Sequence, residues 1–217
     1  FAVMVLGLII VSIPTFFAIT LFLAFSKAAL AQFGNCTASE MRTYVDSATG
    51  NTITMLTDTM KNDRFLYQTD PMWTADGKYL LFRSSSRGND KEVESTLPNG
   101  EKRKWTPTQI YFIEMATGKI IQATEGPNLG SAFLANKTNR MFVSRKEKEN
   151  WNMYVMDLNK FFADVKQGKV GKPSAYETFI GTFPTEMGRP GGYAVDCNDD
   201  YAYITVEREG TEEEKER

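Results

Sequence analysis

The chain has 217 residues and contains no histidine. A histidine base, or a metal site built from histidines, therefore cannot come from these residues. After residue 31, long stretches with apolar residues at helical spacing are also missing, which argues against a helical fold. The Walker pattern of glycines followed by lysine and serine or threonine is absent, and this excludes a phosphate loop of that type.

A strong excess of positive or negative charge is missing as well. The chain carries 25 basic and 27 acidic residues, with a net charge of -2. No cluster of Lys and Arg is interleaved with aromatics, so nucleic acid is not expected as a partner. The composition, 42% hydrophobic and 24% charged, is typical of a globular protein, and the length fits one domain of ordinary size.

Cysteine is scarce, because Cys36 and Cys197 are the only two. An exported setting would permit a disulfide between them, but the sequence alone cannot show that they meet. A lipid-anchored Cys36 is a second reading, although "FGNC" lacks the usual leucine three residues earlier. Two unpaired thiols are the third reading, and the sequence does not decide among them.

The first 25 residues carry no charge, and Ala29 and Ala31 have the spacing that a signal peptidase prefers. Residues 1–31 are therefore predicted to be a signal peptide or an N-terminal anchor that inserts in the membrane. The apolar run is long enough to span a bilayer, so cleavage after Ala31 and retention both stay open. Either way we expect an exported protein of the periplasm or cell envelope, with a linker over 32–41 and the folded domain over 42–217.

Short strands separated by Asn, Asp, Gly and Pro turns follow this segment, which indicates an all-β fold. A local helical insertion is predicted over Asp157 to Gly168, closed by Gly168. A turn followed by an apolar strand occurs three times, about 60 residues apart: "TADGKYLLFRS" from Thr74, "LANKTNRMFVSR" from Leu134 and "DCNDDYAYITVER" from Asp196. This interval exceeds the ~40 to 50 residues of common propeller blades. We assign the excess to insertions, one of them a charged loop from Arg87 to Trp105.

A second repeat lies between these segments. "VDSATGNTITMLTD" from Val45 matches "IEMATGKIIQATEG" from Ile113, and Gly50 and Gly118 are expected to supply the positive φ of their hairpins. The pattern predicts four-stranded blades in which Leu80, Leu81 and Phe82 form a strand buried on both faces. We expect parts of about three blades of a β-propeller, with a β-sandwich as the alternative fold.

These residues resemble the TolB-like (WD40-like) β-propellers and, within them, the oligogalacturonate lyase group. The resemblance covers Arg42 to about Gly210 and rests on "YVDSATGNTITMLTD", "NDRFLYQTDPMWTADGKYLLF", "QIYFIEMATGKIIQATEGPN" and "MYVMDL". It implies a seven-bladed propeller that binds oligogalacturonides and cleaves short pectin fragments by β-elimination. It also implies a divalent metal such as Mn²⁺, and a base, that are held largely by histidines.

The absence of histidine departs from that family. The catalytic histidines are expected beyond Arg217, or else the chain is a non-catalytic envelope propeller that binds a protein or another acidic glycan. The residues proposed for substrate binding are Arg208, which the resemblance places near the substrate carboxylate, and Arg64 and Arg83, with Tyr67, Gln68 and Arg87 beside them. For Arg208, Arg83 and Arg87 a solvated surface position is the alternative. For Arg64, Tyr67 and Gln68 the alternative is that they join the first blade to its neighbour.

Two further features are candidates for the site. Trp105 lies in a polar insertion and is the better candidate for stacking on a sugar, whereas Trp73 is expected in the core. In "EMGRPGGYAVDC", Arg189 and the glycines are predicted to form either a ligand-facing loop or a blade connection. Asp196, Asp199 and Asp200 lack the spacing of a calcium loop and are interpreted as turn formers.

Overall fold

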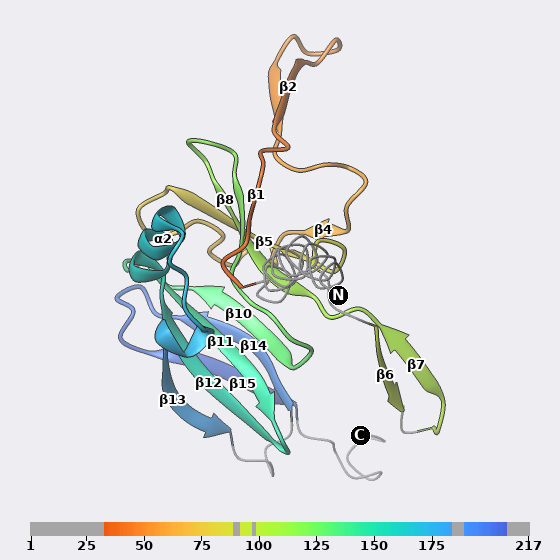
Figure 1. Ribbon diagram of the computed structural model, residues 1–217, viewed down its shortest axis with the longest axis vertical. Helices are drawn as coiled ribbons and strands as arrows, with labels where there is room; N and C mark the ends of the chain where they lie inside the picture. Colours follow the sequence, from red (N-terminus) through yellow and green to blue (C-terminus); the bar gives the residue numbers. More distant parts are fainter. Residues whose placement is uncertain (1–32, 89–91, 97–98, 184–188, 208–217) are drawn as a thin grey trace, which may run out of the picture. The chain divides into compact units, whose positions relative to one another are not determined.

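Antiparallel strands are the main regular structure of the described residues, as the computed structural model shows (Figure 1). The structure describes residues 33–88, 92–96, 99–183 and 189–207, and side chains at 189–190 and 206–207 are not among those described. The predicted signal or anchor segment 1–31 and the charged run after residue 207 lie outside the described residues. Within the described part, no helix is long and apolar enough to cross a membrane.

The first blade is a four-stranded antiparallel sheet with strand order β4-β5-β8-β9, and β1 adds a fifth strand at the β9 edge. Its central strands are apolar on both faces, since Leu80, Leu81 and Phe82 are at most 4% exposed, as expected from the sequence. The strands of the first blade are β4 (Asp63–Arg64), β5 (Tyr79–Ser84), β8 (Gln109–Glu114), β9 (Ile120–Gln122) and β1 (Cys36–Thr37).

The second blade repeats this arrangement with strand order β10-β11-β12-β13, and β14 and β15 then form a two-stranded sheet. The described chain therefore contains two four-stranded blades and a strand pair, which we call the third pair. These strands are β10 (Leu129–Leu134), β11 (Arg140–Glu147), β12 (Asn150–Asp157), β13 (Glu177–Phe183), β14 (Arg189–Val195) and β15 (Ala202–Glu207).

Two hairpins lie outside the blades. The predicted charged loop from Arg87 to Trp105 is wrong, because β6 (Val93–Thr96) and β7 (Lys102–Trp105) pair there, with Lys102 bonded to Glu94. The Val45 segment forms the expected turn, with Gly50 at a φ of 71°, between β2 (Arg42–Val45) and β3 (Thr52–Met55). It forms a separate two-stranded sheet rather than part of a four-stranded blade.

The main core lies between the first and second blades. Leu81 and Phe112 of the first blade belong to the same buried cluster as Leu134 and Met141 of the second. A second cluster joins Phe133 of the second blade to Tyr193 of the third pair, with ring centroids 5.1 Å apart. Because each sheet is apolar on both faces, this face-to-face packing removes both faces of the second blade from water.

The predicted insertion is the helix α2 (Leu158–Gln167), followed by the short 3-10 helix η1 (Pro173–Ala175). Asp157 caps its first turn by accepting a hydrogen bond from the Lys160 N–H, and Gly168 ends it in the left-handed conformation. Although α2 is inserted between two strands of the second blade, its Phe162 stacks on Tyr79 of the first, with centroids 3.6 Å apart. The insertion therefore packs into the interblade core.

The turns before β5, β11 and β15 share one backbone hydrogen bond, and they lie at the three places where the sequence repeats. In each turn the first residue donates its N–H to the carbonyl five residues later, as Thr74 does to Tyr79 at 3.0 Å. Asp199 adopts a φ of 65°, at the position that Gly77 occupies in the first turn with a φ of 68°. Asp196 and Asp199 are thus turn residues, as expected.

Asp199 also links the third pair to the second blade. Its carboxylate accepts hydrogen bonds from the backbone N–H groups of Asn136, Lys137 and Thr138 at 2.6 to 2.9 Å, and its side chain is buried. Burial alone would raise the pKa of Asp199, but these donors together lower it below its usual value. The ionised carboxylate therefore stabilises the contact between the turns.

Because the pKa of Asp199 is lower in the folded than in the unfolded chain, its contribution to stability is complete above about pH 4 and is lost as the pH falls through the folded value. We expect Asp199→Asn to reduce the free energy of unfolding by about 1.5–3 kcal/mol at pH 7. The difference from wild type should shrink in acid, as measured by urea unfolding across pH.

Asp200→Asn is the matched control, because it removes the same charge from the exposed neighbouring residue. It should leave stability nearly unchanged. Two results would contradict this account. One is an equal loss of unfolding free energy in the two variants, and the other is a loss in Asp199→Asn that does not depend on pH.

Candidate functional site

A cleft of about 620 Å³ opens where the innermost strands β4, β10 and β14 come together. We call it the inner cleft. Its wall is formed by Arg64 of β4, Arg83 of β5, and Arg103 and Trp105 of β7. Residues of β10 and β14 form its floor. The lining residues are Asn62, Arg64, Leu66, Tyr67, Asp70, Arg83, Ser85, Arg103, Trp105, Thr106, Thr108, Ile110, Pro127, Leu129, Gly130, Ser131, Ala132, Phe133, Gly191, Gly192 and Tyr193.

Arg64 and Arg83 face each other across neighbouring strands, as Cα partners in the pairing of β4 with β5. Side chains at such positions lie on the same face of a sheet, and like charges placed there repel. No carboxylate of the described residues forms an ion pair with either guanidinium. The arrangement places two exposed cations side by side at the wall of the cleft.

Asn62 holds this part of the wall in position. Its side-chain amide donates to Ser85 Oγ at 2.8 Å, and its carbonyl oxygen accepts from Arg64 Nε at 3.2 Å. Arg83 Nη2 lies 3.5 Å from the Phe65 carbonyl. Among the described residues, the remaining donors of both guanidiniums have no partner, so they can bind a ligand in the cleft.

The cleft also has an aromatic side and a bare backbone floor. Trp105 is 37% exposed at the end of β7, so one part of the indole is open to a ligand. Gly130 lines the floor, and a Cβ at this position would collide with the side chains of Ser144 and Trp151, which would have to move. Three arginines against the single carboxylate of Asp70 make the lining cationic.

The sequence-based site residues are only partly brought together. Arg64, Tyr67, Arg83 and Trp105 line the inner cleft, and Gln68 does not. Arg103 also lines it, and sequence reasoning missed it because the hairpin was interpreted as a charged loop. Trp73 was wrongly expected in the core, because its side chain is 46% exposed.

The glycine-rich segment is a strand rather than a loop. Gly191 and Gly192 belong to β14 and line the cleft. Arg189 begins that strand, but its side chain lies outside the described residues, and Arg208 lies outside them entirely. Cys36 and Cys197 are free and exposed, so they form no disulfide.

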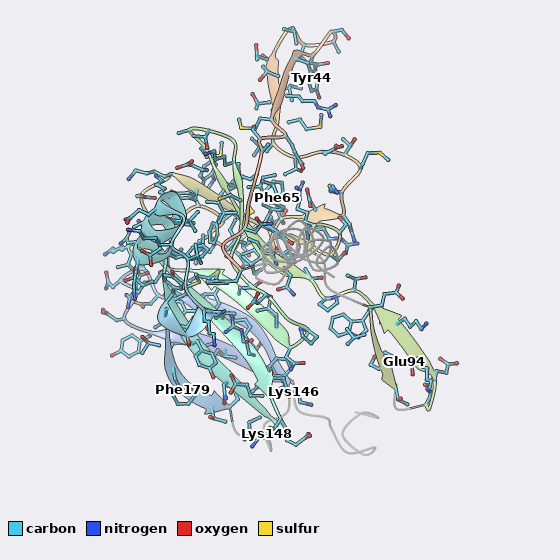
Figure 2. All side chains as sticks on the ribbon, in the orientation of Figure 1. Tyr44, Phe65, Glu94, Lys146, Lys148 and Phe179 are labelled. Atoms are coloured by element: carbon cyan, nitrogen blue, oxygen red, sulfur yellow. The ribbon has the colours of Figure 1, made fainter. Side chains whose placement is uncertain are left out.

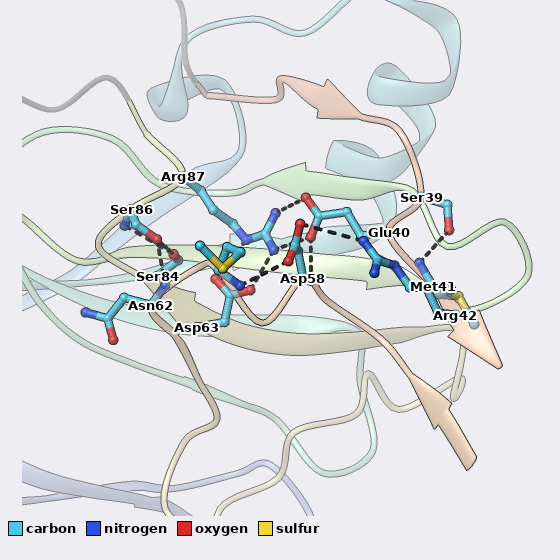
Figure 3. A network of polar contacts seen from close by, with 11 residues as sticks. Ser39, Glu40, Met41, Arg42, Asp58, Asn62, Asp63, Ser84, Ser86 and Arg87 are labelled. Carbon is cyan, nitrogen blue, oxygen red and sulfur yellow. Dashed lines mark hydrogen bonds and ion pairs between the residues drawn. The ribbon is translucent and has the colours of Figure 1, made fainter. Parts of the chain in front are cut away.

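Arg87 is not available to a ligand (Figure 3). Its guanidinium donates to both carboxylate oxygens of Glu40 at 2.6 and 2.9 Å, and to both oxygens of Asp63 at 2.6 and 2.8 Å. Burial alone would lower the pKa of Arg87, but these hydrogen bonds raise it above its usual value. The same contact with Arg87 lowers the pKa of Glu40. Arg87 therefore joins the segment before β2 to the first blade.

Two solved structures share this fold. An oligogalacturonate lyase in complex with manganese matches 77% of this chain and 36% of its own, with a TM-score of 0.53 and 20% identity. The oligogalacturonate lyase of Vibrio parahaemolyticus matches 76% of this chain and 35% of its own, with a TM-score of 0.52 and 21% identity. No family model matches the sequence, and no curated protein matches it.

These matches show that the described strands form part of a β-propeller, and the β-sandwich alternative is excluded. The chain spans about a third of the length of the matched structures. Manganese does not fit the residues described here. The chain has no histidine, and no three Cys, Asp or Glu side chains of the described residues lie together as a metal would need.

Because Arg83 and Arg87 have different environments, we expect their replacement by alanine to have different effects on the free energy of unfolding. Arg87→Ala leaves the carboxylates of Glu40 and Asp63 without their cation, and the Asp63 side chain is only 9% exposed. We expect the free energy of unfolding to fall by about 3–5 kcal/mol. Arg83→Ala, at an exposed position, should change it by less than about 1 kcal/mol. Urea unfolding of both variants measures the difference, and similar losses would contradict the assignment of Arg87 as structural.

Proposed function

We propose that the inner cleft binds acidic oligosaccharides, and that oligogalacturonate is its ligand. The observation that carries this proposal is the pair of facing arginines, Arg64 and Arg83, with no carboxylate partner among the described residues. Two like charges on one face of a sheet repel unless an anion lies between them. A ligand with carboxylates would remove this repulsion and gain charge-assisted hydrogen bonds.

The chemistry of a uronic acid oligomer suits the other parts of the cleft. Each sugar carries one carboxylate, which a guanidinium binds through two parallel hydrogen bonds. Trp105 offers an apolar ring surface beside the arginines, and Arg103 adds a third cation. The bare backbone at Gly130, Gly191 and Gly192 leaves room for a ring to approach the floor.

We further propose that the protein cleaves its ligand by β-elimination. This reaction needs a base to remove the proton at C5 and cations that stabilise the charge developing next to the carboxylate. Arg64 and Arg83 would supply part of that positive charge. The chain has no histidine, and its described residues contain no candidate set for a metal, so we propose that the base and any metal ligands come from residues beyond Arg217. A non-catalytic envelope propeller that binds the same glycan, or a protein, is the alternative.

Binding of trigalacturonate to the full-length protein tests the cleft. Arg83→Gln and Arg64→Gln each remove a charged donor and should weaken binding about tenfold or more, as measured by calorimetry. Arg42→Gln is the matched control, because Arg42 is exposed and does not line the cleft, and it should bind as wild type does. A neutral galactose oligomer should not distinguish the variants. Unchanged affinity in both cleft variants would refute the proposed site.

The same protein samples distinguish a lyase from a non-catalytic binding module. With digalacturonate and Mn²⁺, a chelator-sensitive rise in absorbance from the unsaturated product would support the lyase. Retained binding with no product would favour the non-catalytic module.

We also propose that the protein is exported, on the basis of the uncharged segment 1–25 and the spacing of Ala29 and Ala31. The mass of the mature N-terminus, measured on protein from the cell envelope, distinguishes cleavage after Ala31 from retention. Recovery from the cytoplasm with an intact N-terminus would contradict export.

A further inference from the structure

The β6–β7 hairpin is an addition to the strand plan that the two blades share. In the second blade the central strands β11 and β12 are joined directly by residues 148–149. In the first blade the equivalent strands β5 and β8 are separated by residues 85–108, and this segment contains β6 and β7. The hairpin forms a two-stranded sheet of its own, and no blade strand among those described pairs with it. The first blade therefore completes its four strands without the hairpin.

The two faces of β7 carry different chemistry. Because side chains alternate along a strand, Arg103 and Trp105 lie on one face, and Lys102 and Lys104 lie on the other. Arg103 and Trp105 line the inner cleft, whereas the two lysines do not. Glu94, labelled in Figure 2, is the Cα partner of Lys104 and forms an ion pair with Lys102 at 2.7 Å. The carboxylate of the paired strands therefore lies on the face with the lysines, and the cleft face is cationic.

The cleft face of the hairpin combines a cation with an aromatic ring. The Cα partner of Arg103 is Ser95 and that of Trp105 is Val93, so neutral side chains lie beside both. Arg103 is exposed, and no side chain among the described residues forms a hydrogen bond or an ion pair with its guanidinium. Trp105 is nearer to the blade, and the buried Pro107 follows it. The guanidinium therefore starts from a Cα about 7 Å farther along the hairpin than the indole, at a rise of roughly 3.3 Å per residue.

A single carboxylate cannot use all three arginines of the cleft. Arg64 and Arg83 are Cα partners in one sheet, so both guanidiniums can bind the same anion. A carboxylate has about four lone-pair sites, and two guanidiniums that each donate a pair of hydrogen bonds occupy all of them. Arg103 belongs to a different sheet. Its guanidinium therefore needs a second carboxylate, and each sugar of an oligogalacturonate carries only one.

We propose that the β6–β7 hairpin adds a second subsite to the inner cleft and thereby selects oligosaccharides over single sugars, an inference that rests on the proposed function. Arg64 and Arg83 hold the carboxylate of one uronate residue, Arg103 binds the carboxylate of another, and Trp105 packs against the sugar chain between them. The cleft volume of about 620 Å³ lies in the range of roughly 300–1,000 Å³ that is usual for drug-sized ligands, which are larger than one sugar. A monosaccharide reaches only one of the two subsites.

Calorimetry on the full-length protein without added metal tests the subsite, with trigalacturonate and galacturonic acid as the two ligands. Arg103→Gln should weaken the binding of trigalacturonate about tenfold, and should reduce its affinity advantage over galacturonic acid by the same factor. Lys104→Gln is the matched control, because it removes one charge from the outer face of the same strand, and it should leave that advantage unchanged. Arg83→Gln should weaken the binding of both ligands.

Three results would overturn the subsite alone. The first is an equal loss of affinity for trigalacturonate and galacturonic acid in Arg103→Gln, because Arg103 and Arg83 would then bind the same sugar. The second is an equal loss in Arg103→Gln and Lys104→Gln, which would indicate a general effect of charge. The third is unchanged affinity in Arg103→Gln while Arg83→Gln binds more weakly, and in that case the proposed function still holds. A wild-type protein that binds neither ligand overturns the proposed function itself, and the subsite with it.

Discussion

The two four-stranded blades of the described chain are sheets that are apolar on both faces, and this constraint governs the rest of the described structure. Leu81 and Phe112 are fully buried only because the second blade and α2 cover their sheet. A sheet of this kind has no stable form in isolation, since one uncovered face would expose the apolar side chains of its central strands. Stacking is therefore a condition of folding.

The contacts at the turns complement this stacking. The packing of apolar faces is tolerant of small shifts, whereas a hydrogen bond has a defined direction and length. Asp199 fixes the third pair against the backbone of the second blade, and Asn139 accepts a hydrogen bond from the Asp76 N–H between the first two blades. The inner cleft lies between strands of all three sheets, so the spacing of its arginines and its floor depends on these contacts.

The sequence predicted the strands and turns well because both are local. The apolar run Leu80 to Phe82, the glycine at Gly118 and the capping residues of α2 each act within a few positions. The cleft was predicted only in part. Arg83 and Arg87 are four residues apart and look alike in sequence, yet one is exposed at the cleft and the other is enclosed by Glu40 and Asp63. Those carboxylates come from distant segments, so no local pattern distinguishes the two arginines. Arg103 was missed for a related reason, since alternation in the β6–β7 hairpin is weak among so many charged residues.

The helix α2 changes how the repeats relate to one another. It is inserted in the second blade, but Phe162 stacks on Tyr79 and packs edge-on against Phe112, both in the first. Repeats that touch only through adjacent sheets can separate one at a time. Here the loss of either blade would expose the aromatic face of the helix, so the two blades and α2 form one cooperative unit. The third pair lacks such a helix among the described residues, so its opening would expose the Phe133 face of the second blade but would not uncover α2. The wall of the inner cleft made by β4 and β5 therefore belongs to the cooperative part of the molecule, while the β14 side belongs to the part that opens at lower cost.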